Sequence, residues 1–133
     1  MRIRLSPRLA ALPALVLVLN LAGCAHARER SLVVTATAYN SVVEQTNANP
    51  TLTAWGDRLR PGMKVIAVSR DLIAMGLTHG RRVRIDGLPG EYVVRDKMAK
   101  RWTKKIDLYM GEDVKAARKW GRRTVTIRWA QDD

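Results

Sequence analysis

The sequence predicts a mainly β fold, a small closed barrel of six short strands with one or two short helices. Three observations predict it. Apolar and β-branched residues alternate with polar residues over short stretches, Gly, Pro and Asn separate these stretches, and only one late segment has a clear helical period. A chain with so few helices does not suit a parallel sheet built from βαβ units.

The expected strands are short and each is bounded by turn residues. The first covers 32–39, where β-branched residues are frequent. A long loop without periodicity follows over 41–62, and a short buried strand covers 64–69. The other strands are expected at 81–86 and 91–96, joined by a hairpin loop at 87–90, and at 104–110 and 122–129.

Two helical segments are expected. A brief helical turn covers 70–77, and a longer helix covers 112–121. The longer helix has Glu112 and Asp113 at its positive end, bases toward its negative end, and Gly121 as a cap that can adopt the left-handed conformation.

The first 23 residues have the features of a signal peptide. Three arginines precede an apolar run over 9–23, which is too short, and too broken by Pro13 and Asn20, to suit a membrane span. The run ends in "LAGC", which resembles the lipobox of bacterial lipoproteins, whose signal is cut before a cysteine that is then lipidated. The alternative is an ordinary signal peptide with a chance cysteine, but Cys24 is the only cysteine in the chain.

This resemblance implies a lipid anchor at Cys24 and a place on the periplasmic face of the outer membrane, since residue 25 is Ala rather than Asp. The expected organisation is a signal peptide at 1–23, a lipidated N-terminus and short tether at 24–31, and one barrel domain at 32–130.

The charge of the chain indicates an anionic partner. The net charge is +12, and removal of the three leader arginines leaves +9. Export argues against nucleic acid, so anionic phospholipid and peptidoglycan, with its lactyl and peptide carboxylates, remain as candidates. The charge could also serve solubility alone.

Two acids lie eleven residues apart in the basic stretch "VVRDKMAKRWTKKIDLYM". Strand alternation places Asp107 in mid-strand, on a face with Lys105 and Tyr109, although Asp is disfavoured there. The same alternation places Asp96 at a strand end, on a face with Tyr92 and Val94. If the loop between them folds back, the two carboxylates could lie on neighbouring strands; alternatively, Asp96 accepts turn amides and Asp107 pairs with a base.

Six motifs in order, between Val33 and Trp129, resemble the 3D domain, a family named for three aspartates. They are "TATAYN", "LTAWGD", "KVIAVS", "LIAMGL", "RRVRI" and "ARKWGRRTVTI". The family includes membrane-bound lytic transglycosylase A and many cell-wall proteins. The resemblance implies a double-psi β-barrel that acts on peptidoglycan, with Asp96 and Asp107 at the positions of the second and third aspartates.

The sequence departs from this family at two places. Ser69 stands at the position of the first aspartate, and Asp71 could take its place. The family's loop D-T-G-G-x-I-x-G has become "DKMAKRWT", which has lost the glycines that would let backbone approach a sugar closely.

The resemblance assigns Asp107 the part of the acid that protonates the leaving oxygen of a glycosidic bond. Asp96 would orient Asp107, hold a substrate hydroxyl, or raise the pKa of Asp107 as a like charge. Lys105 would oppose this by lowering the pKa of Asp107. A lytic transglycosylase can manage with one acid, because the C6 hydroxyl of muramic acid is the nucleophile.

The expected substrate contacts come from loops and strand ends. They are Trp102, Lys100, Lys105, Thr53 and Tyr39. Trp55 and Trp102 could each stack on a sugar or be a partly buried loop anchor, Trp120 and Trp129 are assigned to the core, and His79 to the surface. No His, Cys and Asp cluster has metal-ligand spacing, so no metal and no cofactor are expected.

The sequence therefore predicts an outer-membrane lipoprotein that cleaves O-glycosyl bonds of peptidoglycan strands, as a lytic transglycosylase or a hydrolase. The alternative is a non-catalytic wall-binding module in the manner of expansin-like barrels. A third interpretation is a factor that binds lipid head groups. The expected partners are glycan strands and, through the anchor, a membrane, with no nucleic acid; the sequence gives no indication of the oligomeric state.

Overall fold

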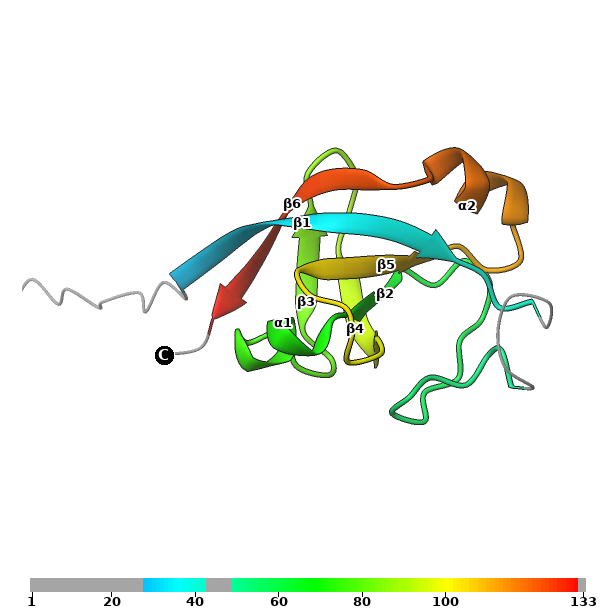
Figure 1. The fold of residues 1–133 in the computed structure, drawn as a ribbon, viewed down its shortest axis with the longest axis horizontal. Coiled ribbons are helices and arrows are strands. Elements are labelled where there is room, and N and C mark those ends of the chain that lie inside the picture. The colour runs from blue at the N-terminus through cyan, green and yellow to red at the C-terminus, as the bar shows by residue number, and fades with distance from the viewer. Residues whose placement is uncertain (1–27, 43–48, 132–133) are drawn as a thin grey trace, which may run out of the picture.

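The computed structural model describes residues 28–42 and 49–131 as a closed β-barrel with two short helices (Figure 1). The strand order around the barrel is β1-β5-β2-β4-β3-β6. The elements are β1 (Arg28–Tyr39), β2 (Val65–Val68), α1 (Arg70–Ala74), β3 (Arg82–Ile85), β4 (Tyr92–Lys97), β5 (Lys105–Tyr109), α2 (Val114–Trp120) and β6 (Arg123–Gln131).

The strands pair in a mixed and non-sequential order. The pairs β1–β5 and β2–β4 are parallel, and the other four contacts around the barrel are antiparallel. Strand β5 lies between β1 and β2 in the barrel, although 65 residues separate it from β1 in the sequence and 36 separate it from β2. The architecture is that of a six-stranded double-psi barrel, and the predicted fold class is confirmed.

The barrel interior is filled by the apolar residues of alternating strand positions. Ile106 and Leu108 of β5 and Ile127 and Trp129 of β6 are almost completely buried, as their alternation predicts. Trp120 of α2 closes one end of the barrel, where its Nε1 donates a hydrogen bond to the Ala36 carbonyl at 3.2 Å. The predicted core positions of Trp120 and Trp129 are confirmed.

Helix α2 is shorter than the predicted 112–121, and two residues of that stretch, Asp113 and Gly121, are its caps. Asp113 caps it by accepting a hydrogen bond from the Ala116 N–H at 2.9 Å. Gly121 ends it with a positive φ of 64° and donates to the Ala117 carbonyl. Helix α1 is shorter than predicted and ends at Ala74, because the chain turns at Gly76, whose φ is 102°.

Strand β1 begins four residues earlier than the sequence predicts. Residues 28–31, which were expected in the tether, pair with the end of β6, where Arg28 lies opposite Gln131. Ladder hydrogen bonds join backbone groups, so this extension needs no apolar alternation. The first and last described residues therefore lie at the same pole of the barrel (Figure 1).

The leader, Cys24 and residues 25–27 lie outside the described residues. All six strands, and the buried residues of the described core, lie between Arg28 and Gln131, so a chain that starts at Ala25 keeps the whole barrel. Neither of the two helices in the described ranges is long and apolar enough to cross a membrane.

Candidate functional site

A β-bulge in β4 decides where Asp96 points. Ile66 and Ala67 are consecutive in β2, but their partners in β4 are Val94 and Asp96, so Arg95 is an extra residue. Val94 is completely buried in the core, whereas Asp96 shares the outer face with Ala67. The prediction that Asp96 lies on the face of Val94 was wrong, because the bulge interrupts the alternation.

Asp96 and Asp107 lie on either side of β2 rather than on neighbouring strands. Ala67 pairs with Asp107 of β5 on one side and with Asp96 of β4 on the other. Thr37 of β1 continues the row beyond Asp107. Because adjacent strands are about 4.8 Å apart, the two aspartate backbones are separated by roughly 10 Å, with only the Ala67 methyl between their side chains.

This row forms the floor of a hollow of about 270 Å³. The residues that line it are Tyr39, Ala67, Asp96, Lys97, Met98, Ala99, Trp102 and Asp107. The loop between β4 and β5 forms its wall. Four of the predicted site residues, Asp96, Asp107, Trp102 and Tyr39, are thus brought together.

A second hollow of about 390 Å³ adjoins the first and shares Tyr39, Asp96 and Lys97 with it. Its other lining residues come from the segment 49–54, which includes Thr53. The two hollows form one groove with Asp96 at the junction.

The Asp107 carboxyl group is in an environment that favours its protonated form. Burial raises its pKa and Asp96 adds to the effect, whereas a hydrogen bond from Thr37 and the charge of Lys105 lower it. The net result is a pKa above the ordinary value of an aspartate. Thr37 Oγ1 lies 3.0 Å from Asp107 Oδ1 and fixes that oxygen. The other oxygen makes no hydrogen bond with the described residues and can face a ligand.

The Asp96 carboxyl group also has a raised pKa, for which burial is the main cause. Its Oδ1 accepts hydrogen bonds from the N–H groups of Ala54 and Lys97, both at 2.9 Å, and these partly offset burial. Asp96 therefore fastens the 53–57 turn to the end of β4. The alternative prediction, that Asp96 accepts amides of the turn after its strand, holds only in part, because one donor is Lys97 of β4 and the other belongs to a turn 42 residues earlier.

Lys105 is buried, with 8 % of its surface exposed, and its Nζ lies 3.6 Å from the centre of the Trp102 ring. This cation–π contact stabilises the buried ammonium, which stays charged and forms no direct ion pair with Asp107. Arg101 also contacts this ring, with its Cζ 5.0 Å from the ring centre. Lys105 thus supports the ring from below, and Trp102 in turn lines the hollow.

Tyr39 lies at the end of β1, between the two hollows. Burial raises the pKa of its phenol, and the nearby Asp96 and Asp107 raise it further, so the group stays protonated. Its hydroxyl is buried and has no hydrogen-bond partner within the described residues. Tyr39 therefore brings an unused hydroxyl donor to the junction of the two hollows.

The other predicted site residues have different roles. Lys100 is exposed in the loop and does not line the hollow. The Thr53 hydroxyl is buried and accepts a hydrogen bond from the Asp57 N–H at 3.0 Å, so it stabilises the turn. Trp55 packs against the core and the edge of His79, with Lys97 Nζ 5.7 Å from its ring centre, and serves as a partly buried anchor.

The family's first aspartate has no substitute in the hollow. Ser69 is completely buried, and its Oγ accepts a hydrogen bond from the Lys105 N–H at 3.0 Å. Asp71 Oδ2 accepts from the Lys104 N–H at 2.9 Å. Burial raises the pKa of Asp71, but its hydrogen bonds outweigh burial and leave the pKa lowered. Both side chains brace the turn before β5.

The loop between β4 and β5 contains no glycine, and its backbone is compatible with this. Within the described chain, Lys104 is the only residue other than glycine with a positive φ, at 44°. The rest of the loop uses conformations that any residue adopts. Side chains of Met98, Ala99 and Trp102 therefore line the hollow where a glycine loop would expose backbone.

Thr37, Ala67 and Lys97 are site residues that the sequence did not indicate. Each belongs to a strand and reaches the site by pairing between strands distant in sequence. Ala67 and Lys97 line the hollow, and Thr37 hydrogen-bonds to Asp107. A polar Thr and a small Ala in alternating stretches are ordinary, so no sequence signal distinguished them.

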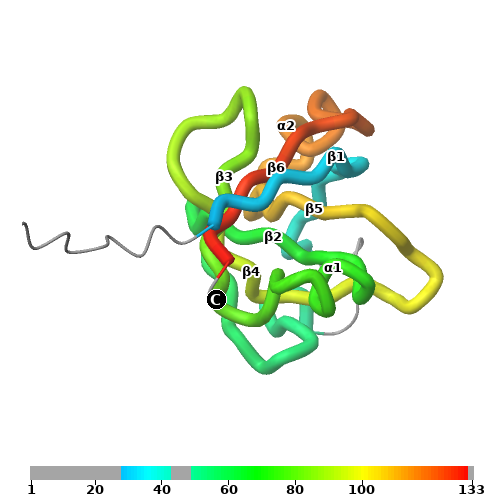
Figure 2. The backbone as a smooth tube through the Cα atoms, turned by 90° about the vertical axis from the view of Figure 1, so that its left-hand side faces the viewer, coloured from blue at the N-terminus to red at the C-terminus, as the bar shows by residue number. Residues whose placement is uncertain are grey.

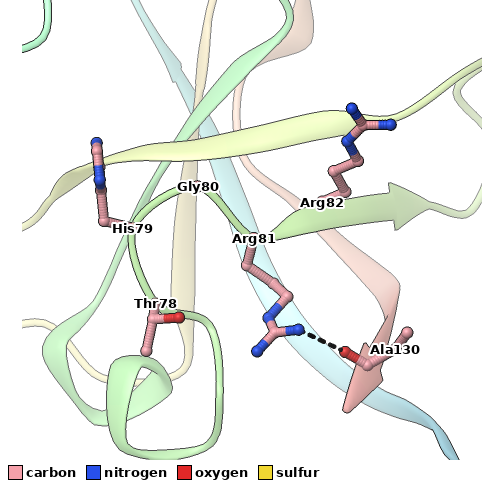
Figure 3. Close-up of a pocket in the computed structure, with 6 residues that line it drawn as sticks. All are labelled: Thr78, His79, Gly80, Arg81, Arg82 and Ala130. Atoms are coloured by element: carbon pink, nitrogen blue, oxygen red, sulfur yellow. Dashed lines mark hydrogen bonds between the residues drawn. The ribbon is translucent and has the colours of Figure 1, made fainter. Parts of the chain in front are cut away.

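A larger hollow, of about 410 Å³, lies elsewhere and has no carboxylate in its lining (Figure 3). Arg81 donates hydrogen bonds to the carbonyls of Gly76 and Ala130, at 3.1 and 3.2 Å. Figure 3 shows that Arg82 and His79 extend away from Arg81, so the three side chains do not converge. His79 is at the surface, as predicted, and pairs with Asp57. Among the described residues, no group of three or more His, Cys, Asp or Glu could hold a metal ion.

Comparison with known proteins gives a fold relative. No family model matches the chain, and no curated protein matches it. A crystal structure of the apo form of an expansin from Clavibacter michiganensis is similar to it, with a TM-score of 0.51 and 18 % sequence identity. The match covers 78 % of this chain and 52 % of that one, so the chain spans about half the length of this relative. The similarity shows a shared barrel fold.

Proposed function

We propose that this protein is a peptidoglycan-acting lipoprotein of the outer membrane that cleaves glycosidic bonds of the glycan strands. The observation that carries the proposal is the pair of carboxyl groups with raised pKa, Asp96 and Asp107, in one groove. Asp107 is the acid: its raised pKa keeps a proton available for the leaving oxygen of a sugar. The lipobox motif and the order of the 3D-type motifs support the cell-wall assignment.

In this mechanism, Asp96 has a supporting part. It shapes the groove by holding the 53–57 turn, and its negative charge raises the pKa of Asp107. Tyr39 donates a hydrogen bond to a substrate oxygen from the groove floor. The ionised Asp107 stabilises the oxocarbenium-like sugar that forms as the bond breaks. It then accepts the proton of the hydroxyl group that attacks this sugar, which is the C6 hydroxyl of muramic acid in a lytic transglycosylase and water in a hydrolase.

The test is to incubate a chain that starts at Ala25 with purified sacculi and to analyse released muropeptides by mass spectrometry. Anhydro-muropeptides would identify a lytic transglycosylase, and reducing-end products a hydrolase. We expect Asp107→Asn to lower release about 100-fold or more. The matched control is Asp86→Asn, because Asp86 is an exposed acid paired with Arg128. Release by Asp107→Asn at the wild-type rate would refute the role of Asp107.

The second candidate function is a non-catalytic wall-binding module. The specific observation in its favour is the ring of Trp102, supported on one face by Lys105 and placed at the wall of the hollow. A flat ring in that position suits stacking on a sugar. In this case wild type and Asp107→Asn would both pellet with sacculi without releasing muropeptides, whereas Trp102→Ala would pellet poorly and Trp102→Phe would retain most of the binding.

A further inference from the structure

Two stretches of the chain hold most of its excess positive charge. Residues 97–105 contain five bases and no acid, and residues 115–123 also contain five bases and no acid. The first stretch ends β4, forms the following loop and begins β5, and the second covers most of α2 and the start of β6. In the sequence they are separated by β5 and an acidic turn.

Strand β1 brings the two stretches together. Thr35 pairs with Lys105 of β5 on one side and with Thr124 of β6 on the other, and Ala36 lies likewise between Ile106 and Arg123. The strand spacing of about 4.8 Å puts Lys105 and Thr124 roughly 10 Å apart. Figure 2 shows that the loop after β4 (yellow) and the chain after α2 (orange) project on the same side of the barrel.

Most of these bases are exposed, and we refer to the exposed ones as the cationic face. It consists of Lys100, Arg101, Lys104, Lys115, Arg118, Lys119, Arg122 and Arg123. None of them forms an ion pair with a carboxylate in the described ranges, whereas Arg84, Arg95 and Arg128 elsewhere on the barrel do. The cationic face is therefore a concentrated positive charge that the protein itself does not neutralise.

We propose that the cationic face binds the free carboxylates of peptide branches on the glycan strand that lies in the groove. The substrate class is then a carboxylate-rich, peptide-bearing glycan rather than a neutral one. This inference rests on the proposed function and specifies its substrate. Lys105 adjoins the cationic face and lies two residues, about 7 Å, from Asp107 along β5. An extended branch of four residues reaches up to about 14 Å, enough to pass from the groove onto the face.

The experiment compares native sacculi with sacculi whose free carboxylates have been capped as amides, using the chain that starts at Ala25. The test variant is Lys119→Gln with Arg122→Gln, which removes two exposed charges from the part of the face away from the groove. The control is Arg28→Gln with Arg82→Gln, which removes two exposed charges at the starts of β1 and β3. Pelleting is measured across a salt series, and muropeptide release in parallel.

We expect the test variant to bind native sacculi about three- to tenfold more weakly than wild type and with a shallower dependence on salt. Wild type and the test variant should bind capped sacculi equally. The control variant should bind native and capped sacculi as wild type does, at every salt concentration. Equal weakening by the control would overturn the inference, because net charge alone would then explain binding. Undiminished binding of capped sacculi by the wild type would also overturn it. The inference would likewise fail if the wild type bound anionic phospholipid vesicles and the test variant bound them more weakly by the same factor as it does sacculi. Binding without muropeptide release would support the inference and refute the proposed cleavage.

Discussion

The pKa of the Asp107 carboxyl group is set by opposing influences. Thr37 and Lys105 favour the ionised carboxylate, and burial and Asp96 favour the neutral acid. Burial is the largest of these influences, and the Lys105 ammonium forms no ion pair with the carboxylate that would reverse it. A carboxyl group so placed can donate a proton at a higher pH than a solvated aspartate can.

Asp107→Asn should stabilise the fold at neutral pH. The pKa of Asp107 in the folded protein is above its value in the unfolded chain, which is about 3.9. The free energy of unfolding therefore falls as the pH rises from the unfolded-state pKa to the folded-state pKa, because only the unfolded chain ionises freely in that range. Asn avoids this cost and can still accept the hydrogen bond from Thr37. We expect an unfolding midpoint about 2–6 °C above wild type at pH 7 and no difference near pH 3, measured by circular dichroism.

Asp86→Asn provides a control of opposite sign. The hydrogen bond from Arg128 holds the pKa of Asp86 below its ordinary value, so the charged form stabilises the fold above the unfolded pKa, and this is lost as the pH falls. This variant should therefore be no more stable than wild type at pH 7. A wild type more stable than Asp107→Asn at pH 7 would contradict the raised pKa of Asp107.

Ala67 keeps the hollow open between the two acids. Its methyl group is the only side chain between them on the outer face of β2, so Ala67→Leu would fill the space that a sugar needs. We expect more than a tenfold loss of sacculus binding and of muropeptide release, with both carboxylates still present. Ala130→Leu, at an exposed position near the end of β6, should behave as wild type. Undiminished binding by Ala67→Leu would place the glycan elsewhere.

At the scale of the elements, the bulge in β4 links the acid pair to the segment before β2. It turns Asp96 outward, and Asp96 then binds the Ala54 N–H of a turn that is 42 residues away in sequence. The turn has further support from Thr53, Asp57 and Arg95. The shape of the groove therefore depends on a carboxylate as well as on apolar packing.

Asp96→Ala should loosen this turn without opening the barrel. Hydrogen bonds to charged groups contribute about 1.5–3 kcal/mol, so exchange of the Ala54 amide hydrogen should become about 10- to 100-fold faster. Amides inside β1 and β6 should keep their protection, because their ladder is intact. Hydrogen exchange followed by NMR is the measurement, and unchanged protection at Ala54 would show that the turn is held by other contacts.

At the scale of the whole molecule, the barrel starts close to the predicted anchor. Only residues 25–27 separate Cys24 from β1, which corresponds to about 10 Å of extended chain. Thr37, beside Asp107, is nine residues further along β1, about 30 Å from Arg28. A lipid anchor at Cys24 would therefore hold the pole of the termini near the membrane and leave the groove at a distance from it.

The anchor itself is testable by intact mass. Protein extracted from membranes of expressing bacteria should begin at Cys24 and carry acyl chains, since stable anchoring takes more than one chain. Cys24→Ser should carry no acyl mass and should not be cut at that position. An unmodified thiol, or a mature N-terminus elsewhere in the leader, would contradict the lipobox assignment.

The sequence by itself determined the barrel class, its helix caps and most of its core. Ile106, Leu108, Ile127 and Trp129 are in the interior because alternation selects a face, and it does so wherever the strand is regular. The motif order likewise pointed to a double-psi barrel, and the spacing of Asp96 and Asp107 singled out the two acids. These properties are local, or depend only on position along the chain.

Only the tertiary structure decided how the acids are arranged and what surrounds them. The bulge at Arg95 reverses the face of Asp96, β2 inserts Ala67 between the acids, and β1 joins two basic stretches into one face. Burial of Asp107 outweighs the charge of Lys105, whose ammonium lies against the Trp102 ring. Each of these depends on which strands pair and in which register. That choice is made by the packing of the closed barrel and leaves no periodic signal in the sequence.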